Sequence, residues 1–136
     1  MKKILTSILA AALIFSLAAC SSNKLAEVYK EDEVIARAKE IVDIINTYSY
    51  DEVTAELRED LQDQLTAEQL ESALDSQLKA AGEFLEYKTE AVYGQKDSSE
   101  DKDYAVAVLI CKYENASLTY TISMDKDLNI VGLYMK

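Results

Sequence analysis

The chain has 136 residues, with 25 Asp and Glu against 14 Lys and Arg, and its formal net charge is −11. This acidic balance argues against nucleic-acid binding, because affinity for nucleic acid depends on Lys and Arg that contact the phosphates. Histidine is absent, so the commonest general base and metal ligand is missing. The three glycines are scattered singly, which excludes a glycine-rich phosphate loop, and an apolar content of 49% argues against disorder.

The first 19 residues have the pattern of a signal peptide. Lys2 and Lys3 form a positive start, and residues 4–19 carry no charge. This apolar segment is short for a membrane span, which needs about 20 residues, and it suits the apolar core of a signal peptide. A retained N-terminal anchor helix is the alternative.

The end of this segment, Leu17-Ala18-Ala19-Cys20, resembles the lipobox of bacterial lipoproteins. The resemblance implies cleavage after Ala19 and a diacylglycerol thioether on Cys20, the first residue of the mature protein. Stable anchoring needs two or more acyl chains, such as palmitate, because each buried methylene contributes only about 0.8 kcal/mol. We therefore expect an outward-facing lipoprotein at the cell membrane, or at the outer membrane of a Gram-negative cell. An ordinary signal peptide with an incidental cysteine is the alternative.

We divide the chain into a signal peptide (1–19), a lipidated tether (20–30) and a single domain (31–136). Loss of Lys2 and Lys3 leaves 12 basic residues in the mature chain, whose formal charge is then −13. Such a domain is repelled by an anionic bilayer, so we expect contact with the membrane only through the lipid on Cys20. Cys111 then has no disulfide partner and no histidine to activate it, and we expect it to pack in the core.

Helical periodicity predicts three helices in the first part of the domain. Apolar residues recur at helical spacing over residues 31–48 and again over residues 50–61. The third helix is expected to open at Thr66, which forms a capping-box pattern with Gln69. It is expected to end at Gly82, where a glycine commonly terminates a helix.

Strand periodicity replaces helical periodicity after Gly82. Four strands are predicted, over residues 84–93, 104–113, 118–124 and 128–135, with a polar loop over residues 94–102. Short connections imply an antiparallel meander. The sequence therefore predicts an α+β fold in which three N-terminal helices pack on one face of a four-stranded antiparallel sheet.

Alternation assigns the side chains of the strands to two faces. The inward set is Leu85, Tyr87, Ala91, Tyr93 and Tyr120, and the outward set is Glu86, Lys88, Glu90, Thr119, Thr121 and Ser123. Tyrosine combines an apolar body with a polar tip. Tyr87 and Tyr120 are therefore candidates to line a ligand pocket, and filling the core is the alternative. The outward hydroxyl residues are compatible with a dimer contact.

Three segments, YDEV (50–53), LTAEQL (65–70) and AGEF (81–84), resemble the domain of unknown function 3887. The resemblance extends over about residues 31–135, and that family looks like a branch of the nuclear transport factor 2-like superfamily. It implies a cone-like fold in which a strongly curved sheet wraps the helices. Members of the superfamily include enzymes, binding modules and association domains, so the fold does not decide the function. No catalytic residue carries over.

The sequence assigns no catalytic, cofactor or metal-binding residue. Residues 125–129 have the D-x-D-x-N spacing of a calcium loop, but Ile130 stands where the loop needs glycine, so we interpret them as a hairpin turn. We expect a binding or association domain for an apolar small molecule, an envelope protein or a second copy of the chain. A small enzyme that uses carboxylates and tyrosines, and a structural accessory lipoprotein, are the alternatives.

Overall fold

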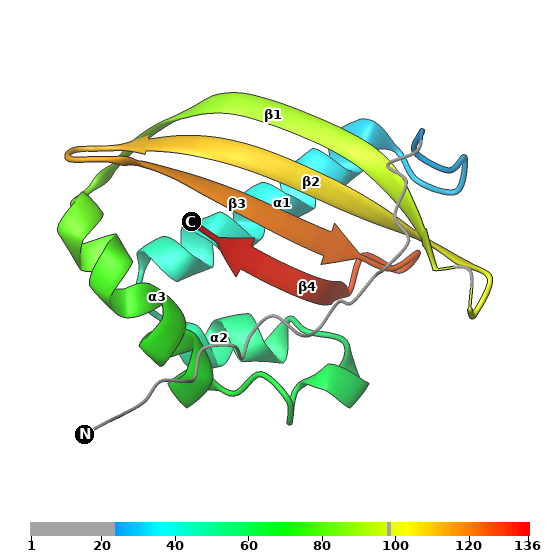
Figure 1. Ribbon diagram of the computed structural model, residues 1–136, viewed down its shortest axis with the longest axis horizontal. Helices are drawn as coiled ribbons and strands as arrows, with labels where there is room; N and C mark the ends of the chain where they lie inside the picture. Colours follow the sequence, from blue (N-terminus) through cyan, green and yellow to red (C-terminus); the bar gives the residue numbers. More distant parts are fainter. Residues whose placement is uncertain (1–23, 98) are drawn as a thin grey trace, which may run out of the picture.

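The computed structural model describes residues 24–97 and 99–136 (Figure 1). Its elements are α1 (Glu31–Asn46), α2 (Tyr50–Ala55), a 3₁₀ turn η2 (Glu59–Leu61), α3 (Ala67–Ala81), β1 (Phe84–Asp97), β2 (Lys102–Tyr113), β3 (Ser117–Met124) and β4 (Ile130–Met135). The strands form one antiparallel sheet in the order β1-β2-β3-β4, which does not close into a barrel. The predicted α+β fold is confirmed.

The predicted signal peptide, Cys20 and the first residues of the predicted tether lie outside the described residues. Within the described part of the chain, no helix is both long enough and apolar enough to cross a membrane.

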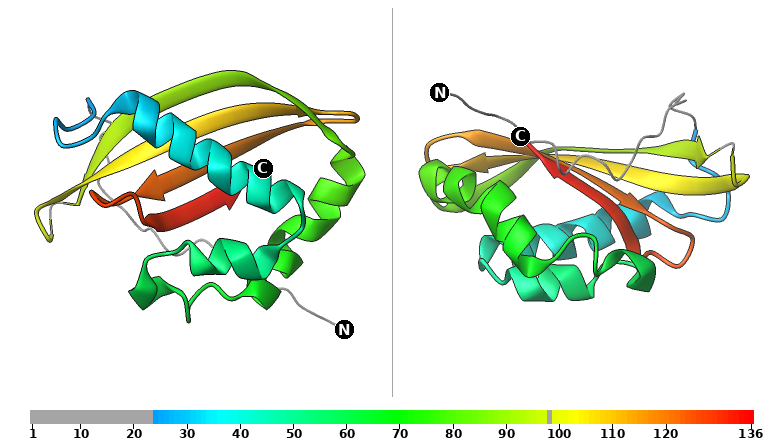
Figure 2. Two further views of the ribbon diagram at one scale, coloured as in Figure 1. Left: turned by 180° about the vertical axis from the view of Figure 1, so that it is seen from behind. Right: turned by 60° about the horizontal axis from the view of Figure 1, so that its bottom comes forward.

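The sheet is covered on one face by α1, which runs across β1, β2 and β3 (Figure 2). The buried stripe of α1 includes Val34, Ala38, Ile41 and Ile45, as its helical spacing predicts. The helix ends at Asn46, two residues earlier than predicted. Thr47 Oγ1 donates a hydrogen bond to the carbonyl of Ile44 at 2.7 Å, and Tyr48 then takes a left-handed conformation with φ +63°.

The prediction of one helix over residues 50–61 is wrong. The helix α2 ends at Ala55, because the backbone that follows pairs with the start of β4 instead of continuing the helix. Leu57 forms a parallel bridge with Ile130, and the amide of Arg58 donates to the carbonyl of Ile130 at 2.8 Å. These bonds join segments more than 70 residues apart, so no local pattern predicts them.

The third helix begins and ends as predicted. Thr66 and Gln69 form the capping box, and Gly82 ends α3 with φ +88°. Leu70, Leu74 and Leu78 of α3 are buried in the same core as α1. The helices α2 and α3 thereby extend the helical layer beside the sheet.

The assignment of faces in β1 is partly wrong, because the strand carries two irregularities in its pairing with β2. They fall at Leu85, which is 52% exposed, and at Lys88. Each adds a residue and reverses the alternation that follows it. Tyr87 still faces the helices, as predicted, whereas Ala91 and Tyr93 lie on the opposite face. Glu90, predicted to point outward, lies on the helix-facing side and forms an ion pair with Lys39 of α1.

The predicted loop over residues 94–102 is also too long. The strand β1 continues to Asp97, because Gln95, Lys96 and Asp97 pair with β2 through their backbones. Backbone pairing does not require apolar side chains, so the polar composition of this segment concealed the strand.

Candidate functional site

The sheet has a second face, opposite the helices, that we call the open face. Its centre consists of two rows of residues that lie side by side across the four strands. The first row is Tyr93, Val106, Ser123 and Gly132, and the second is Ala91, Val108, Thr121 and Tyr134. No residue of either row is charged, although 29% of the chain is Asp, Glu, Lys or Arg. Among the described residues, no helix packs against this face (Figure 2).

The open face is built mainly from small apolar and hydroxyl side chains. Ile110 and Thr119 pair next to the second row and continue the uncharged surface. Tyr134, on the edge strand β4, is 55% exposed, whereas Val106 near the centre of the sheet is 1% exposed. A charged pair, Glu86 of β1 opposite Lys112 of β2, marks one end of the uncharged surface.

The strand β2 is apolar on both faces. Ala105, Ala107 and Leu109 face the helices and belong to the core, while Val106 and Val108 lie on the open face. Continuous apolar strands are typical of sheets that are covered on both sides, whereas half-covered antiparallel sheets alternate apolar and polar residues. The composition of β2 therefore fits a strand that is buried on both faces, and Val106 on the open face is indeed only 1% exposed.

The tyrosines that face the helices form a hydrogen-bond network with α1. Tyr113 donates to Oδ1 of Asn46 at 2.5 Å, so the 2.8 Å bond between the hydroxyls of Tyr113 and Tyr120 has Tyr120 as its donor. Tyr120 is fully buried. The hydroxyl of Tyr87 lies 3.4 Å from the carbonyl of Lys39, at a separate point on α1.

The two pocket candidates, Tyr87 and Tyr120, thus lie on the helix-facing side, as predicted, but they do not bond to each other. Each is held by a protein partner: Tyr120 by Tyr113, and Tyr87 by α1. Lys39 also lies over the ring of Tyr87, with Nζ 4.7 Å from the centroid. These contacts favour the core-filling alternative for both tyrosines.

The interior makes its titratable groups poor acids. Burial raises the pKa of the Cys111 thiol to about 12, and burial raises the pKa of Tyr113 to about 12 as well. Burial likewise raises the pKa of Tyr120, and the hydrogen bond with Tyr113 adds to the increase. Cys111 is therefore a neutral thiol at physiological pH, which agrees with packing rather than nucleophilic chemistry.

A pocket of about 660 Å³ lies at one end of the sheet, where the β1–β2 and β3–β4 turns meet. Arg58 lines it and is held by Asp60 through two bonds, with Nε to Oδ1 at 2.6 Å and Nη2 to Oδ2 at 3.1 Å. Lys102 and Lys126 also line it and form ion pairs with Glu100 and Asp127 respectively. The basic groups of this pocket are already paired with carboxylates.

The D-x-D-x-N segment forms the turn between β3 and β4. One carboxylate oxygen of Asp125 accepts hydrogen bonds from the amides of Asp127 and Asn129, at 3.0 and 2.9 Å. Its other oxygen accepts from the side-chain amide of Asn129 at 3.3 Å. The carboxylate thus stabilises its own turn, which gives the pattern a structural role.

Sequence reasoning located part of the open face and missed the rest. Thr119, Thr121 and Ser123 lie on it as predicted, because β3 alternates regularly. Ala91 and Tyr93 were missed because of the irregularities in β1. The signal that was available is the unbroken apolar run of β2, which indicates burial on both faces.

Two comparisons with known proteins found matches for this chain, one to a solved structure and one to a family. An NMR structure of a protein from Ruminococcus gnavus ATCC 29149 is similar to the chain, with a TM-score of 0.75 and 28% sequence identity over 87% of this chain and 100% of that one. No curated protein matches the sequence. The model of the family described as protein of unknown function (DUF3887) matches residues 38–133, which confirms the resemblance seen in the sequence. The chain therefore belongs to the DUF3887 family.

Proposed function

We propose that the protein is a lipid-anchored extracytoplasmic lipoprotein whose domain associates with a second copy of itself through the open face. The observation that carries the proposal is the composition of β2, which is apolar on a face that no described helix covers. Interfaces are depleted of charge at their centres and enriched in tyrosine, as the two rows across the sheet are.

The charge of the mature chain also favours this site of contact. Two molecules of formal charge −13 repel each other. Two uncharged surfaces bring together no like charges at the contact, and their hydroxyl groups can donate and accept across it. In the first row Val106, Ser123 and Gly132 are buried, whereas every residue of the second row keeps exposed surface. The second row is therefore the part of the molecule best suited to meet an identical copy.

The membrane anchor contributes to the same proposal. The lipobox at Cys20 confines the mature protein to one membrane, and confinement raises the effective concentration of each copy for its neighbours. A weak contact then becomes sufficient. We place the family near the nuclear transport factor 2-like superfamily, in which association domains occur, and we assign the protein a binding role rather than a catalytic one.

Sedimentation of the mature domain without its lipid tests the proposal. We expect a concentration-dependent monomer–dimer equilibrium. Thr121→Lys places a charge at the centre of the open face and is expected to weaken the dimer at least tenfold, which corresponds to about 1.4 kcal/mol. Ser76→Lys makes the same change in charge on the exposed surface of α3 and serves as the matched control.

Three outcomes contradict the proposal. A wild-type domain that stays monomeric at every concentration excludes self-association. Equal weakening by Thr121→Lys and Ser76→Lys places the contact elsewhere than the open face. A full-length protein that remains membrane-bound and processed when Cys20→Ala is introduced excludes the lipid anchor.

The pocket at Tyr87 and Tyr120, for an apolar small molecule, stays a prediction. A small enzyme and a structural accessory lipoprotein remain the other candidate functions. A lipoprotein of the last class shows neither a ligand nor a dimer, so the sedimentation experiment separates it from the proposed function.

A further inference from the structure

We propose that the domain stands end-on on the bilayer, with one particular end of the sheet facing the lipid. This end, the tether end, comprises residues 24–29, the β1–β2 turn (99–101) and the β3–β4 turn (125–129). The inference rests on the proposed lipidation of Cys20. The orientation identifies the surface of the anchored domain that faces the membrane and the surfaces that face away from it.

Residues 24–29 are fixed to the sheet. The hydroxyl of Tyr29 donates to the carbonyl of Asp103 at 2.7 Å, next to the start of β2, and Tyr29 is 6% exposed. Leu25 and Ala26 are half-buried against the core. Gly94 of β1 has no side chain, and a Cβ there would collide with the backbone of Lys24. The chain therefore reaches this end of β1 and β2 in a docked conformation.

Only a short length of chain separates the docked segment from the proposed anchor. Lys24 is four residues after Cys20, and four residues span at most about 14 Å. The strand β2 has 12 residues, and a strand of that length extends about 40 Å. The tether is thus too short for the opposite end of the sheet, at the β2–β3 turn, to face the membrane while residues 24–29 remain docked.

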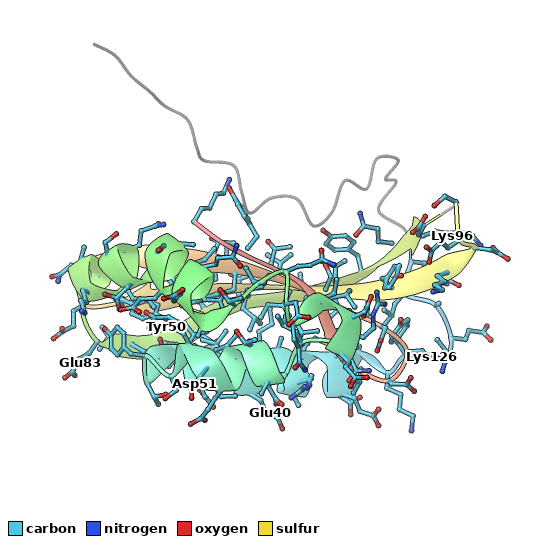
Figure 3. All side chains as sticks on the ribbon, turned by 90° about the horizontal axis from the view of Figure 1, so that it is seen from below. Glu40, Tyr50, Asp51, Glu83, Lys96 and Lys126 are labelled. Atoms are coloured by element: carbon cyan, nitrogen blue, oxygen red, sulfur yellow. The ribbon has the colours of Figure 1, made fainter. Side chains whose placement is uncertain are left out.

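The tether end carries five acids and two lysines, and part of its negative charge is paired locally. Val28 is 62% exposed and presents an apolar side chain there. Two of its acids form ion pairs, Asp101 with Lys96 at the end of β1 and Asp127 with Lys126. Lys96 and Lys126 lie at one end of the molecule, and Glu83 lies at the other (Figure 3). Local pairing lowers the repulsion that a strongly acidic domain meets at an anionic membrane.

The orientation has a consequence for the open face. The strands lead away from the tether end, and the open face extends along them (Figure 1). A domain that stands on the tether end therefore presents its open face sideways, toward other proteins anchored in the same membrane. The pocket lined by Arg58 and Asp60 then faces the lipid headgroups.

Energy transfer from the protein to labelled lipid headgroups tests the orientation. The full-length acylated protein is reconstituted into vesicles of phosphatidylcholine and phosphatidylglycerol. One fluorophore is placed on Ser99→Cys in the tether end, or on Asn115→Cys in the β2–β3 turn; both replaced residues are exposed and uncharged. Cys111 is buried and the wild type serves as the labelling blank. Because the two turns are separated by about the length of β2, we expect transfer at residue 99 to exceed that at residue 115 by roughly threefold or more.

Equal transfer at the two positions, or stronger transfer at residue 115, overturns the orientation. Flotation of the same vesicles separates this result from failure of the anchor. Wild-type protein that does not float with the vesicles refutes the lipid anchor, whereas floating protein with equal transfer refutes only the orientation.

Two variants test the cause of the orientation. Gly94→Ala displaces Lys24 from β1 and is expected to float normally but to lose most of the difference between the two positions. Where Gly94→Ala does not fold, a Gly/Ser insertion of about 12 residues before Lys24 serves instead. It leaves the sequence of the domain unchanged and is also expected to remove most of the difference, because the added linker reaches roughly 20 Å. A difference that persists with the long linker contradicts the role of the docked tether.

Discussion

At the scale of single residues, the most informative side chain is Tyr113, because its hydroxyl joins a helix to a strand across the core. It donates to Asn46 of α1 and accepts from Tyr120 of β3. Tyr120 is fully buried, so its proton has no water to bond when Tyr113 is removed. The stability of the fold therefore depends on both hydroxyls together rather than on each alone.

Replacement of these tyrosines by phenylalanine is expected to be strongly non-additive. Tyr113→Phe leaves the buried hydroxyl of Tyr120 without a hydrogen-bond partner and should lower the free energy of unfolding by about 1–3 kcal/mol. Tyr120→Phe leaves Tyr113 bonded to Asn46 and should cost about 1 kcal/mol. The double variant should be no less stable than Tyr113→Phe alone. Urea unfolding of the wild type, the two single variants and the double variant measures the coupling between the two hydroxyls. Purely additive losses of stability would show that the two hydroxyls are independent.

Alkaline pH is expected to unfold the domain through its buried thiol and phenols. Cys111 and Tyr113 have pKa values raised to about 12, from ordinary values of 9.0 and 10.0, chiefly by burial. At pH values between the ordinary and the raised pKa, the unfolded chain releases protons that the folded chain keeps, so the unfolded state gains stability as the pH rises. Stability should be full below pH 9 and fall steadily toward pH 12.

The midpoint of urea unfolding, measured at a series of pH values, tests the alkaline loss. The variant Cys111→Ala lacks the thiol contribution, so its decline should begin about one pH unit later than that of the wild type. A midpoint that stays constant from pH 8 to pH 11 would contradict the assignment of these groups to the folded core.

At the scale of the elements, the end of α3 is set by one glycine. Gly82 has φ +88° and ψ −152°, a conformation that side chains strongly disfavour. A Cβ there would also come within 2.7 Å of Oε1 of Glu114 and 3.1 Å of Nδ2 of Asn115. Glu114 in turn accepts a hydrogen bond from the amide of Glu83 at 2.9 Å, so the glycine lets α3 meet the β2–β3 turn closely.

Gly82→Ala should therefore lower the free energy of unfolding by about 1–3 kcal/mol. Thr66→Ala removes the cap at the other end of α3 and provides the comparison, with an expected cost of about 1 kcal/mol. Thermal and urea unfolding, followed by circular dichroism, give both values. A Gly82→Ala variant as stable as the wild type would show that the turn after α3 relaxes without cost.

The sequence predicted those elements whose signals are local. The capping box at Thr66 and the glycine at position 82 fixed both ends of α3, and the alternation of β3 fixed which side chains face the helices. It failed where distant backbone decides the structure. The bridge from Leu57 to Ile130 ends α2 early, and the irregularities at Leu85 and Lys88 reverse the faces of β1.

At the scale of the whole molecule, the candidate site was only half predictable for the same reason. The hydroxyl residues of β3 could be assigned from alternation. The two uncharged rows exist only once four strands are in register, and that register depends on the pairing of β1 with β2. The interior tyrosines were correctly placed, but their hydrogen-bond partners on α1 and β2 required the structure.

The overall charge predicts how the association through the open face responds to salt. Two copies of residues 20–136, each of formal charge −13, repel each other, whereas the proposed contact itself carries no charge in its two central rows. Salt screens the repulsion, since the Debye length falls from about 30 Å at 0.01 M to about 8 Å at 0.15 M. The dimer should therefore become tighter as sodium chloride is raised over this range. Thr121→Lys should remain the weaker dimer at every salt concentration.

Sedimentation equilibrium at several salt concentrations measures this dependence. A contact made by ion pairs, such as one between Glu86 of one copy and Lys112 of another, would respond in the opposite direction, because salt screens attraction as well as repulsion. The sign of the salt dependence thus distinguishes an uncharged interface on the open face from a charged one at its margin. A dimer that weakens with added salt would refute the proposed contact even if Thr121→Lys also weakened it.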